Sequence, residues 1–259
     1  MKEIKRYLES KVGNYSFYFE DLKSGYTYGF NEEVEMPAAG CIKLPIAMAL
    51  MKEVEQKNIS LKDIVSIGDE DKVDGDFGII HEFSDKEYAI KELLIAMLIQ
   101  SDNTAASKII NILGMNNINN LIKNMGLKST KVNKYPSDVR VENRHENITT
   151  SYDLSQCFKL LHNKVTLTDE HSDLILNILK RHQLAKKILF YFPREVQLCT
   201  ANKIGTLESV ENDTVLMNLP KGNFVATMMS SELPTNVYGS TTIARAGKMM
   251  FDMIDKDWN

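Results

Sequence analysis

The sequence predicts an α+β protein in which strands from both ends of the chain form one antiparallel sheet around an inserted helical lobe. Strand-like segments occur near the two ends, at residues 15–30 and 196–230, whereas the segments between them have helical periodicity. Because strands so far apart in sequence can share a sheet only if the chain ends meet in space, we expect two lobes. We place the α/β lobe at residues 1–45 and 190–259 and the helical lobe at residues 46–189.

The N-terminal segment is predicted to contain a helix, a β-hairpin and the start of a second helix. Residues 2–11 have helix-forming composition, and two aromatic-rich runs, 15–20 and 26–30, flank turn residues and predict the hairpin. Apolar residues recur at helical spacing after Gly40. Because Pro45 is tolerated only near the start of a helix, that helix must begin close to Gly40.

The middle of the chain is predicted to be helical. Gly114 and Gly126 mark helix ends, and Thr168, followed by two acidic residues, is a typical N-cap. From these signals we expect helices at 87–99, 104–113, 116–125, 151–163 and 169–182. The pattern then reverts to strands, at 196–203, 213–219 and 224–230, before a final helix, 241–254, capped by Ser240.

The composition excludes several classes of protein. The formal net charge of −4 argues against a dedicated nucleic-acid binder, which would carry a basic face. The five histidines are scattered without metal-ligand spacing, so we expect neither a metal nor another cofactor. Three cysteines without a CxxC pair do not form a disulfide framework. We expect a monomer that acts on a small molecule.

The sequence contains no apolar run long enough to span a membrane. The first ten residues, MKEIKRYLES, lack the apolar core of a signal peptide. We therefore expect either a cytoplasmic protein or a secreted one whose leader has been removed.

Residues 40–43, Gly-Cys-Ile-Lys, lie where the second helix begins. Backbone N–H groups at a helix N-terminus stabilise developing negative charge, so this is a favourable place for an acyl-transfer nucleophile. Lys43 follows residue 40 by three positions and shares its helix face, where a lysine of lowered pKa can serve as a base. The simpler interpretation is a helix start followed by a solvent-exposed lysine.

Two further short motifs follow. Ser101-Asp102-Asn103 stands between two apolar helices, and its simplest interpretation is a helix cap for residues 104–113. Lys203-Ile204-Gly205-Thr206 ends a strand, where the simplest interpretation is an exposed lysine. Alternatively, both motifs supply polar groups to a cleft. For Ser101-Asp102-Asn103, the helix cap and the role in a cleft are compatible.

In order and spacing, these three motifs resemble S-x-x-K, S-D-N and K-[ST]-G, the active-site motifs of class A β-lactamases and related penicillin-recognising serine hydrolases. The resemblance extends to residues 21–31, 61–65, 90–97 and 244–245, and so covers essentially the whole chain. It implies the β-lactamase/DD-peptidase-like fold, in which a helical lobe packs on a five-stranded antiparallel sheet flanked by terminal helices. The site would lie between the lobes.

The resemblance also implies a role for each motif residue, with β-lactams or acyl-peptide-like amides as substrates. Gly40 occupies the position of the nucleophile, Lys43 that of its base, and Ser101 that of the group that passes a proton to the leaving nitrogen. The backbone N–H groups of residues 40 and 206 would form the oxyanion hole. The residues that would bind substrate are Asn103, Lys203, Gly205 and Thr206.

Gly40 is the main departure from this family, which has serine there, and three explanations compete. Gly40 is an engineered replacement of serine, or it marks a natural pseudoenzyme that keeps its binding cleft, or Cys41 has become the nucleophile. Cys41 lies about 200° round the helix from Lys43, so we expect it to face away and to serve packing. Ile204 departs as well, because the usual Ser/Thr hydroxyl there helps to bind a carboxylate.

The family activates its hydrolytic water with a glutamate in a loop before a Thr-Thr pair, which Thr149-Thr150 matches. The preceding segment is short, and its Glu142 and Glu146 lack the expected E-x-x-L-N context. Glu142 is the candidate for deacylation, against the simpler interpretation of a surface acid. The sequence thus predicts a β-lactamase-like serine hydrolase that is inactive or impaired at Gly40, or alternatively a non-catalytic module that binds β-lactam- or cell-wall-peptide-like ligands.

Overall fold

The computed structural model describes residues 1–75, 77–136, 146–184 and 187–258. Its main sheet is antiparallel and has five strands in the order β2-β1-β9-β8-β7. These strands are β1 (Asn14–Asp21), β2 (Thr27–Phe30), β7 (Ala201–Leu207), β8 (Val210–Leu219) and β9 (Gly222–Ser231). The N-terminal hairpin therefore joins the C-terminal strands through the β1–β9 pair, as predicted, and β7 lies at one edge.

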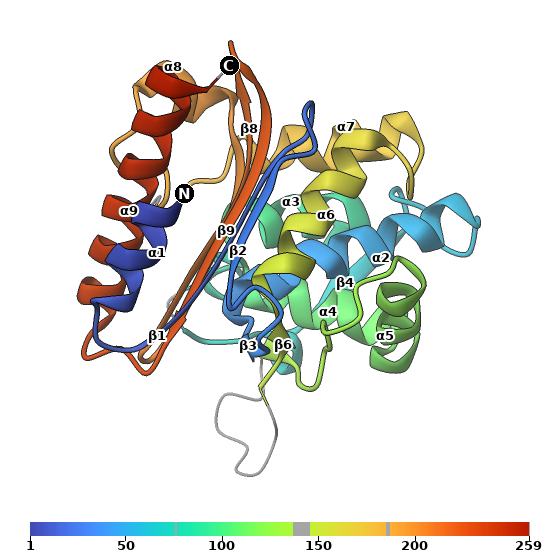
Figure 1. Ribbon diagram of the computed structural model, residues 1–259. Coiled ribbons are helices and arrows are strands. Elements are labelled where there is room, and N and C mark those ends of the chain that lie inside the picture. The colour runs from blue at the N-terminus through green and yellow to red at the C-terminus, as the bar shows by residue number, and fades with distance from the viewer. Residues whose placement is uncertain (76, 137–145, 185–186, 259) are drawn as a thin grey trace.

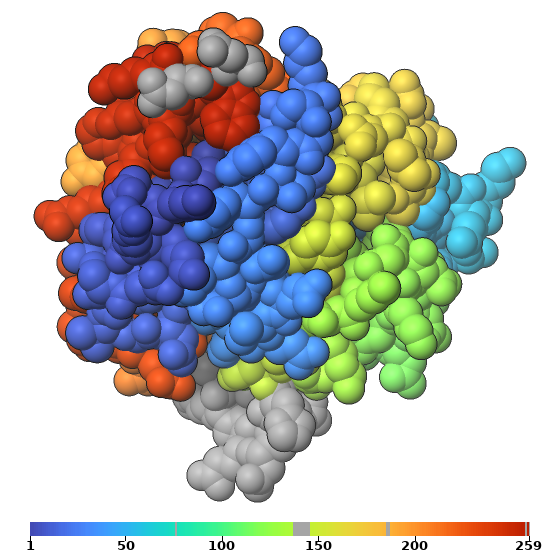
Figure 2. All heavy atoms as spheres, in the orientation of Figure 1, coloured from blue at the N-terminus to red at the C-terminus, as the bar shows by residue number. Residues whose placement is uncertain are grey.

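The terminal helices cover one face of this sheet (Figure 1). They are α1 (Lys2–Glu9) and α9 (Asn236–Asp257), with the short α8 (Arg194–Cys199) nearby. Ile4 of α1 and Met250 of α9 are fully buried in one hydrophobic cluster with Phe17 and Phe19 of β1. In the space-filling view, the blue N-terminal residues lie directly against the red C-terminal ones (Figure 2). The two ends of the chain are thus held together by a shared core.

The remaining long helices lie on the opposite face of the sheet (Figure 1). They are α2 (Lys43–Glu55), α3 (Ile90–Ile99), α4 (Asn103–Leu113), α5 (Met115–Asn124), α6 (Ser151–Asn163) and α7 (Asp169–Leu179). Residues 43–51 of α2 are all buried, which is the pattern of a helix surrounded by other elements on every side. The exact division into lobes at residues 45 and 190 stays a prediction.

Within the described ranges, two small sheets and three 3₁₀ turns connect these parts. β3 (Met36–Pro37) pairs with β6 (Ile148–Thr149), and β4 (Ile64–Ile67) pairs with β5 (Lys86–Ala89). The 3₁₀ turns are η1 (Ala39–Ile42), η2 (Asp69–Asp71) and η3 (Ile80–Glu82). The turn η1 leads directly into α2, so the second helix begins near Gly40, as Pro45 predicted. None of the helices described is both long and apolar enough to cross a membrane.

Three predictions of local structure were wrong. The helix expected from residue 87 begins at Ile90, because residues 86–89 pair with β4 instead. The strand expected from residue 196 begins at Ala201, and the preceding residues form α8 after Pro193, which suits a helix start. The last helix begins at Asn236, and its cap is Thr235, whose side chain accepts the Tyr238 N–H, so Ser240 lies within the helix.

Candidate active site

A cavity of about 410 Å³ lies where η1, the α3–α4 junction and the edge strand β7 meet. Its walls come from residues of segments 37–43, 101–103, 134–136, 146–147 and 204–210, together with Phe77. The three sequence motifs therefore meet at one cavity although more than a hundred residues separate the first from the last. Lys43, Ser101 and Asn103 all line it, as do Gly40, Gly205 and Thr206.

Lys43 connects the first motif to the second through three hydrogen bonds. Its Nζ donates to the Ser101 carbonyl oxygen at 2.5 Å, to Ser101 Oγ at 3.0 Å and to Asn103 Oδ1 at 2.6 Å. The residue is only 3% exposed, so the interpretation as a solvent lysine is wrong. Burial, and secondarily the positive charge of Lys203, lower the pKa of Lys43 well below its usual value. The lowered pKa favours the neutral amine, which is the form that can accept a proton.

The Ser101-Asp102-Asn103 turn is held rigidly by the middle residue. Asp102 Oδ1 accepts the Ala105 N–H at 2.8 Å and so caps α4, while Oδ2 accepts the N–H groups of Ile79 and Ile80 at 2.7 and 2.9 Å. The cap interpretation is therefore confirmed, and the same turn also presents Ser101 to the cavity. Ser101 has a φ of 53°, a left-handed conformation that is disfavoured for serine and that the surrounding contacts must stabilise.

Lys203 lies behind the cavity and does not line it. It is fully buried, and its Nζ donates to Ser101 Oγ and to the Ile204 carbonyl oxygen, each at 3.0 Å. Burial lowers the pKa of Lys203 to about 8. The interpretation as an exposed lysine is wrong, and a bound carboxylate would experience the charge of Lys203 through Ser101 and the strand backbone.

Both glycines of the motifs stand where two backbones approach closely. A Cβ on Gly40 would lie 2.9 Å from the Ile204 carbonyl oxygen and 3.0 Å from Ser101 Oγ. A Cβ on Gly205 would lie 2.9 Å from the Ala38 carbonyl oxygen and from the Gly40 nitrogen. The role of Gly205 in binding substrate stays a prediction; in this structure the glycine makes room for the η1 turn. Any residue larger than glycine at either position requires β7 and η1 to move apart.

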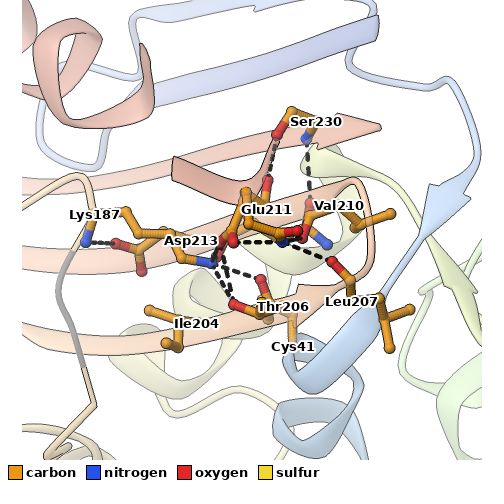
Figure 3. A network of polar contacts seen from close by, with 12 residues as sticks. Cys41, Lys187, Ile204, Thr206, Leu207, Val210, Glu211, Asp213 and Ser230 are labelled. Atoms are coloured by element: carbon orange, nitrogen blue, oxygen red, sulfur yellow. Dashed lines mark hydrogen bonds and ion pairs between the residues drawn. The ribbon is translucent and has the colours of Figure 1, made fainter. Parts of the chain in front are cut away.

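Sequence reasoning missed Lys187, whose side chain reaches Thr206 (Figure 3). Lys187 is 4% exposed and pairs with Glu211; its Nζ donates to the Gly205 carbonyl oxygen at 2.6 Å and to Thr206 Oγ1 at 3.1 Å. Thr206 Oγ1 in turn donates to Glu211 Oε2 at 3.1 Å. Lys187 belongs to no recognisable motif, so only its position in space indicates that it supports this part of β7.

Asp213 extends the same buried network along β8. Its Oδ2 accepts the backbone N–H groups of Lys187 and Ile188 at 3.2 and 2.9 Å. Burial raises the pKa of Asp213 to about 6, against the opposing effect of the Lys187 charge. Asn212 on the same strand donates to the carbonyl oxygens of Pro37 and Ala38 at 2.9 and 3.2 Å. These contacts fix the turn that carries Gly40 against the sheet.

Cys41 has the properties of a packing residue. It is fully buried, clusters with Met36, Leu154 and Met229, and its thiol donates to the Lys203 carbonyl oxygen at 3.3 Å. Burial raises the pKa of the thiol to about 12. A protonated thiol outside the cavity is a poor nucleophile, so the structure favours the packing role over a cysteine mechanism.

Glu142 lies outside the described residues, and its role stays a prediction. Glu146 does line the cavity, but its carboxylate is paired with Lys134, whose Nζ lies 2.5 Å from Glu146 Oε1. Thr149 belongs to β6, and Thr150 caps α6 by accepting the Asp153 N–H. Among the described residues, no group of three or more histidine, cysteine or acidic side chains is arranged to hold a metal ion.

The fold and this cavity define a protein of the β-lactamase/transpeptidase fold class, and comparison with known proteins identifies the family. A family model described as the β-lactamase enzyme family matches residues 1–254. The chain therefore belongs to the β-lactamase enzyme family. A β-lactamase of Bacteroides uniformis is 22% identical over 240 residues, which cover 86% of this chain and 80% of the relative.

Solved structures agree with the fold. A β-lactamase from Sphaerobacter thermophilus superposes with a TM-score of 0.88 at 22% identity, covering 98% of this chain and 97% of its own. PBP-A superposes with a TM-score of 0.89 at 24% identity, covering 98% and 95%. The TLA-3 extended-spectrum β-lactamase gives a TM-score of 0.91 at 19% identity, covering 98% of both chains. The predicted five-stranded antiparallel sheet with its helices is thus confirmed.

Proposed function

We propose that the chain binds β-lactams or related acyl-peptide amides in the cavity beside β7, and that it cannot form an acyl-enzyme at residue 40 because Gly40 has no hydroxyl. The observation that carries the proposal is the contact set of Lys43. Its Nζ meets Ser101 and Asn103 within 3.0 Å, in a chain that belongs to the β-lactamase enzyme family. One similar structure, a variant of PBP-A, is an acyl-enzyme complex with penicillin G.

With serine restored at residue 40, each group has one step in this proposal. Neutral Lys43 takes the serine proton, and the serine oxygen attacks the carbonyl carbon. The N–H groups of residues 40 and 206 stabilise the negative oxygen of the tetrahedral intermediate. Ser101 then passes a proton to the leaving nitrogen as the C–N bond breaks. Asn103 and the charge of Lys203 orient the substrate.

Deacylation is expected to be slow in the same proposal. The carboxylate of Glu146, which lines the cavity, is paired with Lys134 and is therefore less available to activate water. A restored enzyme would accumulate its acyl form, as penicillin-binding proteins do. This expectation assumes that Glu142 does not supply the missing base.

The alternative is a non-catalytic module that recognises β-lactam- or cell-wall-peptide-like ligands in this cavity. The close contact at Gly40 favours it, because the Ile204 carbonyl oxygen stands 2.9 Å from where a side chain would begin. A site adapted to glycine would accept serine only with some displacement of β7. The engineered and the natural origin of Gly40 both remain compatible with this geometry.

The test compares Gly40→Ser with Gly40→Ala, which adds the same Cβ without the hydroxyl. A fluorescent penicillin and a chromogenic cephalosporin report acylation and turnover. We expect the serine variant to be labelled and to release the label slowly, and the alanine variant to gain no labelling over the unmodified chain. A folded serine variant that is neither labelled nor hydrolytic would contradict the enzyme proposal. Calorimetric binding of penicillin to the unmodified chain, without turnover, would support the binding module.

A further inference from the structure

The cavity presents one hydroxyl that contacts two lysine amines, that of Ser101. Its Oγ lies 3.0 Å from Lys43 Nζ and 3.0 Å from Lys203 Nζ. The hydroxyl of Thr206, which also lines the cavity, instead contacts an ion pair, that of Lys187 with Glu211. We propose that Ser101 is itself a nucleophile in this chain and forms a covalent ester with activated acyl compounds such as β-lactams. The inference rests on the proposed function only in that the same cavity must admit the acyl compound.

Loss of a proton from Lys43 would change one of its three contacts, because a neutral amine has two N–H donors and one lone pair. Two of its three neighbours, the Ser101 carbonyl oxygen and Asn103 Oδ1, can only accept a hydrogen bond. Lys43 donates to Ser101 Oγ in this structure, but in the neutral amine these two acceptors take both N–H donors. The contact with Ser101 Oγ then reverses, and the hydroxyl donates to the lone pair of Lys43. Among the described residues, no carboxylate forms an ion pair with Lys43 that would keep it protonated, and burial favours the neutral form.

Lys203 differs from the neutral base Lys43 in its role, because it supplies a positive charge next to the attacking oxygen. It approaches Ser101 Oγ from behind the cavity, and a pKa of about 8 keeps it largely protonated at neutral pH. An ammonium donating to the oxygen stabilises the negative charge that develops as the proton leaves. Ser101 is thus placed between a base and an electrostatic stabiliser.

The glycine at residue 40 leaves the approach to Ser101 open. A Cβ on Gly40 would lie 3.0 Å from Ser101 Oγ, so a larger residue would stand between that oxygen and a carbonyl carbon in the cavity. The backbone of Ser101 is held at a φ of 53° by the turn that Asp102 fixes through Ile79, Ile80 and Ala105. The hydroxyl therefore faces the cavity in a fixed orientation, which favours attack.

The step is a balanced acyl transfer that needs no further reactant. Lys43 takes the Ser101 proton as the oxygen forms a bond to the carbonyl carbon, and the carbonyl electron pair moves onto its oxygen. That pair returns as the C–N bond breaks, and the Lys43 ammonium gives the proton to the leaving nitrogen. The product is a serine ester of the ring-opened β-lactam.

The experiment incubates the unmodified chain with a fluorescent penicillin and follows it by intact-mass spectrometry and peptide mapping. We expect the mass of one penicilloyl group on the peptide that contains Ser101, formed more slowly than in Gly40→Ser. Ser101→Gly, which tolerates the left-handed φ, should abolish the label, because no hydroxyl remains at residue 101 to be acylated. The matched control is Ser107→Ala on α4, whose buried hydroxyl has no hydrogen-bond partner among the described residues, and it should label normally.

Three results would overturn the inference. They are a label on another residue, undiminished labelling of Ser101→Gly, and no label although calorimetry shows that penicillin binds. If penicillin does not bind at all, the proposed function fails instead, and p-nitrophenyl acetate replaces it as a probe that needs little recognition. Failure of the unmodified chain to acetylate Ser101 with that probe then overturns the inference by itself. Peptide mapping of the unmodified chain shows whether Ser101 carries the label even if Ser101→Gly does not fold.

Discussion

Buried lysines on the two sides of β7 have different environments. On the cavity side, Lys43 and Lys203 are 3% and 0% exposed, and among the described residues no carboxylate forms an ion pair with either. On the other side, Lys187 is 4% exposed and pairs with Glu211 (Figure 3). All three donate to backbone carbonyl oxygens, so hydrogen bonding does not distinguish them. What distinguishes Lys187 from Lys43 and Lys203 is its ion pair with a carboxylate.

This difference separates an ion-paired lysine from two lysines whose pKa is lowered. A buried ammonium without a counter-charge is destabilised relative to the neutral amine, so the pKa values of Lys43 and Lys203 are lowered. A buried ion pair, once formed, is costly to break because one charge is left alone. The following variants test whether the two sides of β7 differ in this way, from the largest expected effect to the smallest.

Lys187→Met should have the largest effect on stability. It leaves the Glu211 carboxylate buried with only polar neighbours, and breaking such a pair destabilises a protein by about 3–5 kcal/mol. Urea unfolding measures the loss. The double variant Lys187→Met/Glu211→Gln removes both charges and should recover part of the stability. A loss under about 1 kcal/mol, typical of an exposed pair, would show that the two sides do not differ.

Lys203→Met should change the dependence of stability on pH. The pKa of Lys203 falls from 10.5 unfolded to about 8 folded, so between these values the unfolded chain binds a proton that the folded chain has lost. Stability therefore rises with pH across this window, by up to roughly 3 kcal/mol, and Lys203→Met should lack this rise. Unfolding free energies of both proteins at the two ends of the window measure it. If the unfolding free energies of both proteins changed equally with pH, the lowered pKa of Lys203 would be contradicted.

Gly40→Ala should cost about 1–3 kcal/mol, as overpacking usually does. The new Cβ would contact the Ile204 carbonyl oxygen at 2.9 Å, and backbone cannot move away as a flexible side chain can. Urea unfolding again measures the change. An alanine variant as stable as the unmodified chain would mean that β7 and η1 separate easily. The cavity would then accept serine without strain.

Thr206→Val should have the smallest effect, about 1 kcal/mol, because it removes one hydroxyl that bridges the ion pair. In a chain of this size, the melting temperature should fall by about 2–4 °C. Ser107→Ala is the control, since its hydroxyl has no hydrogen-bond partner within the described part of the chain. Equal shifts in the two variants would show that the Thr206 hydroxyl does not contribute through the pair.

The fold was predictable where local pattern and tertiary structure agree. The hairpin, the central helices and the C-terminal strands follow the periodicity of their apolar residues, and their bounds differ by a few residues at most. The pattern failed at residues 86–89, which continue a helical composition but pair with residues 64–67 as a strand. It failed again at residues 196–199, which were expected to begin a strand but lie in α8. Strand formation depends on a partner strand, which the local sequence does not specify.

The sequence predicted which residues form the site, but it did not predict how deeply its lysines are buried. The motifs identified Lys43, Ser101 and Asn103, and the structure brings these residues together at one cavity. The interpretations of Lys43 and Lys203 as exposed lysines were wrong, because burial depends on elements distant in sequence. Lys187 was missed for the same reason, since it lies in a segment without a motif and reaches β7 only in the folded chain.

The sequence by itself determined the family, the sheet assembled from both chain ends and the glycine at residue 40, where the family resemblance predicts a nucleophile. These properties follow from features of the local sequence, namely motif spacing, hydrophobic periodicity and residue identity. Only the tertiary structure decided that Ser101 Oγ lies between two lysine amines and that β7 packs against Gly40 too closely for a side chain. Burial, pKa and contact distance are set by what surrounds a residue in space, and residues 40, 101 and 203 meet only when the chain folds.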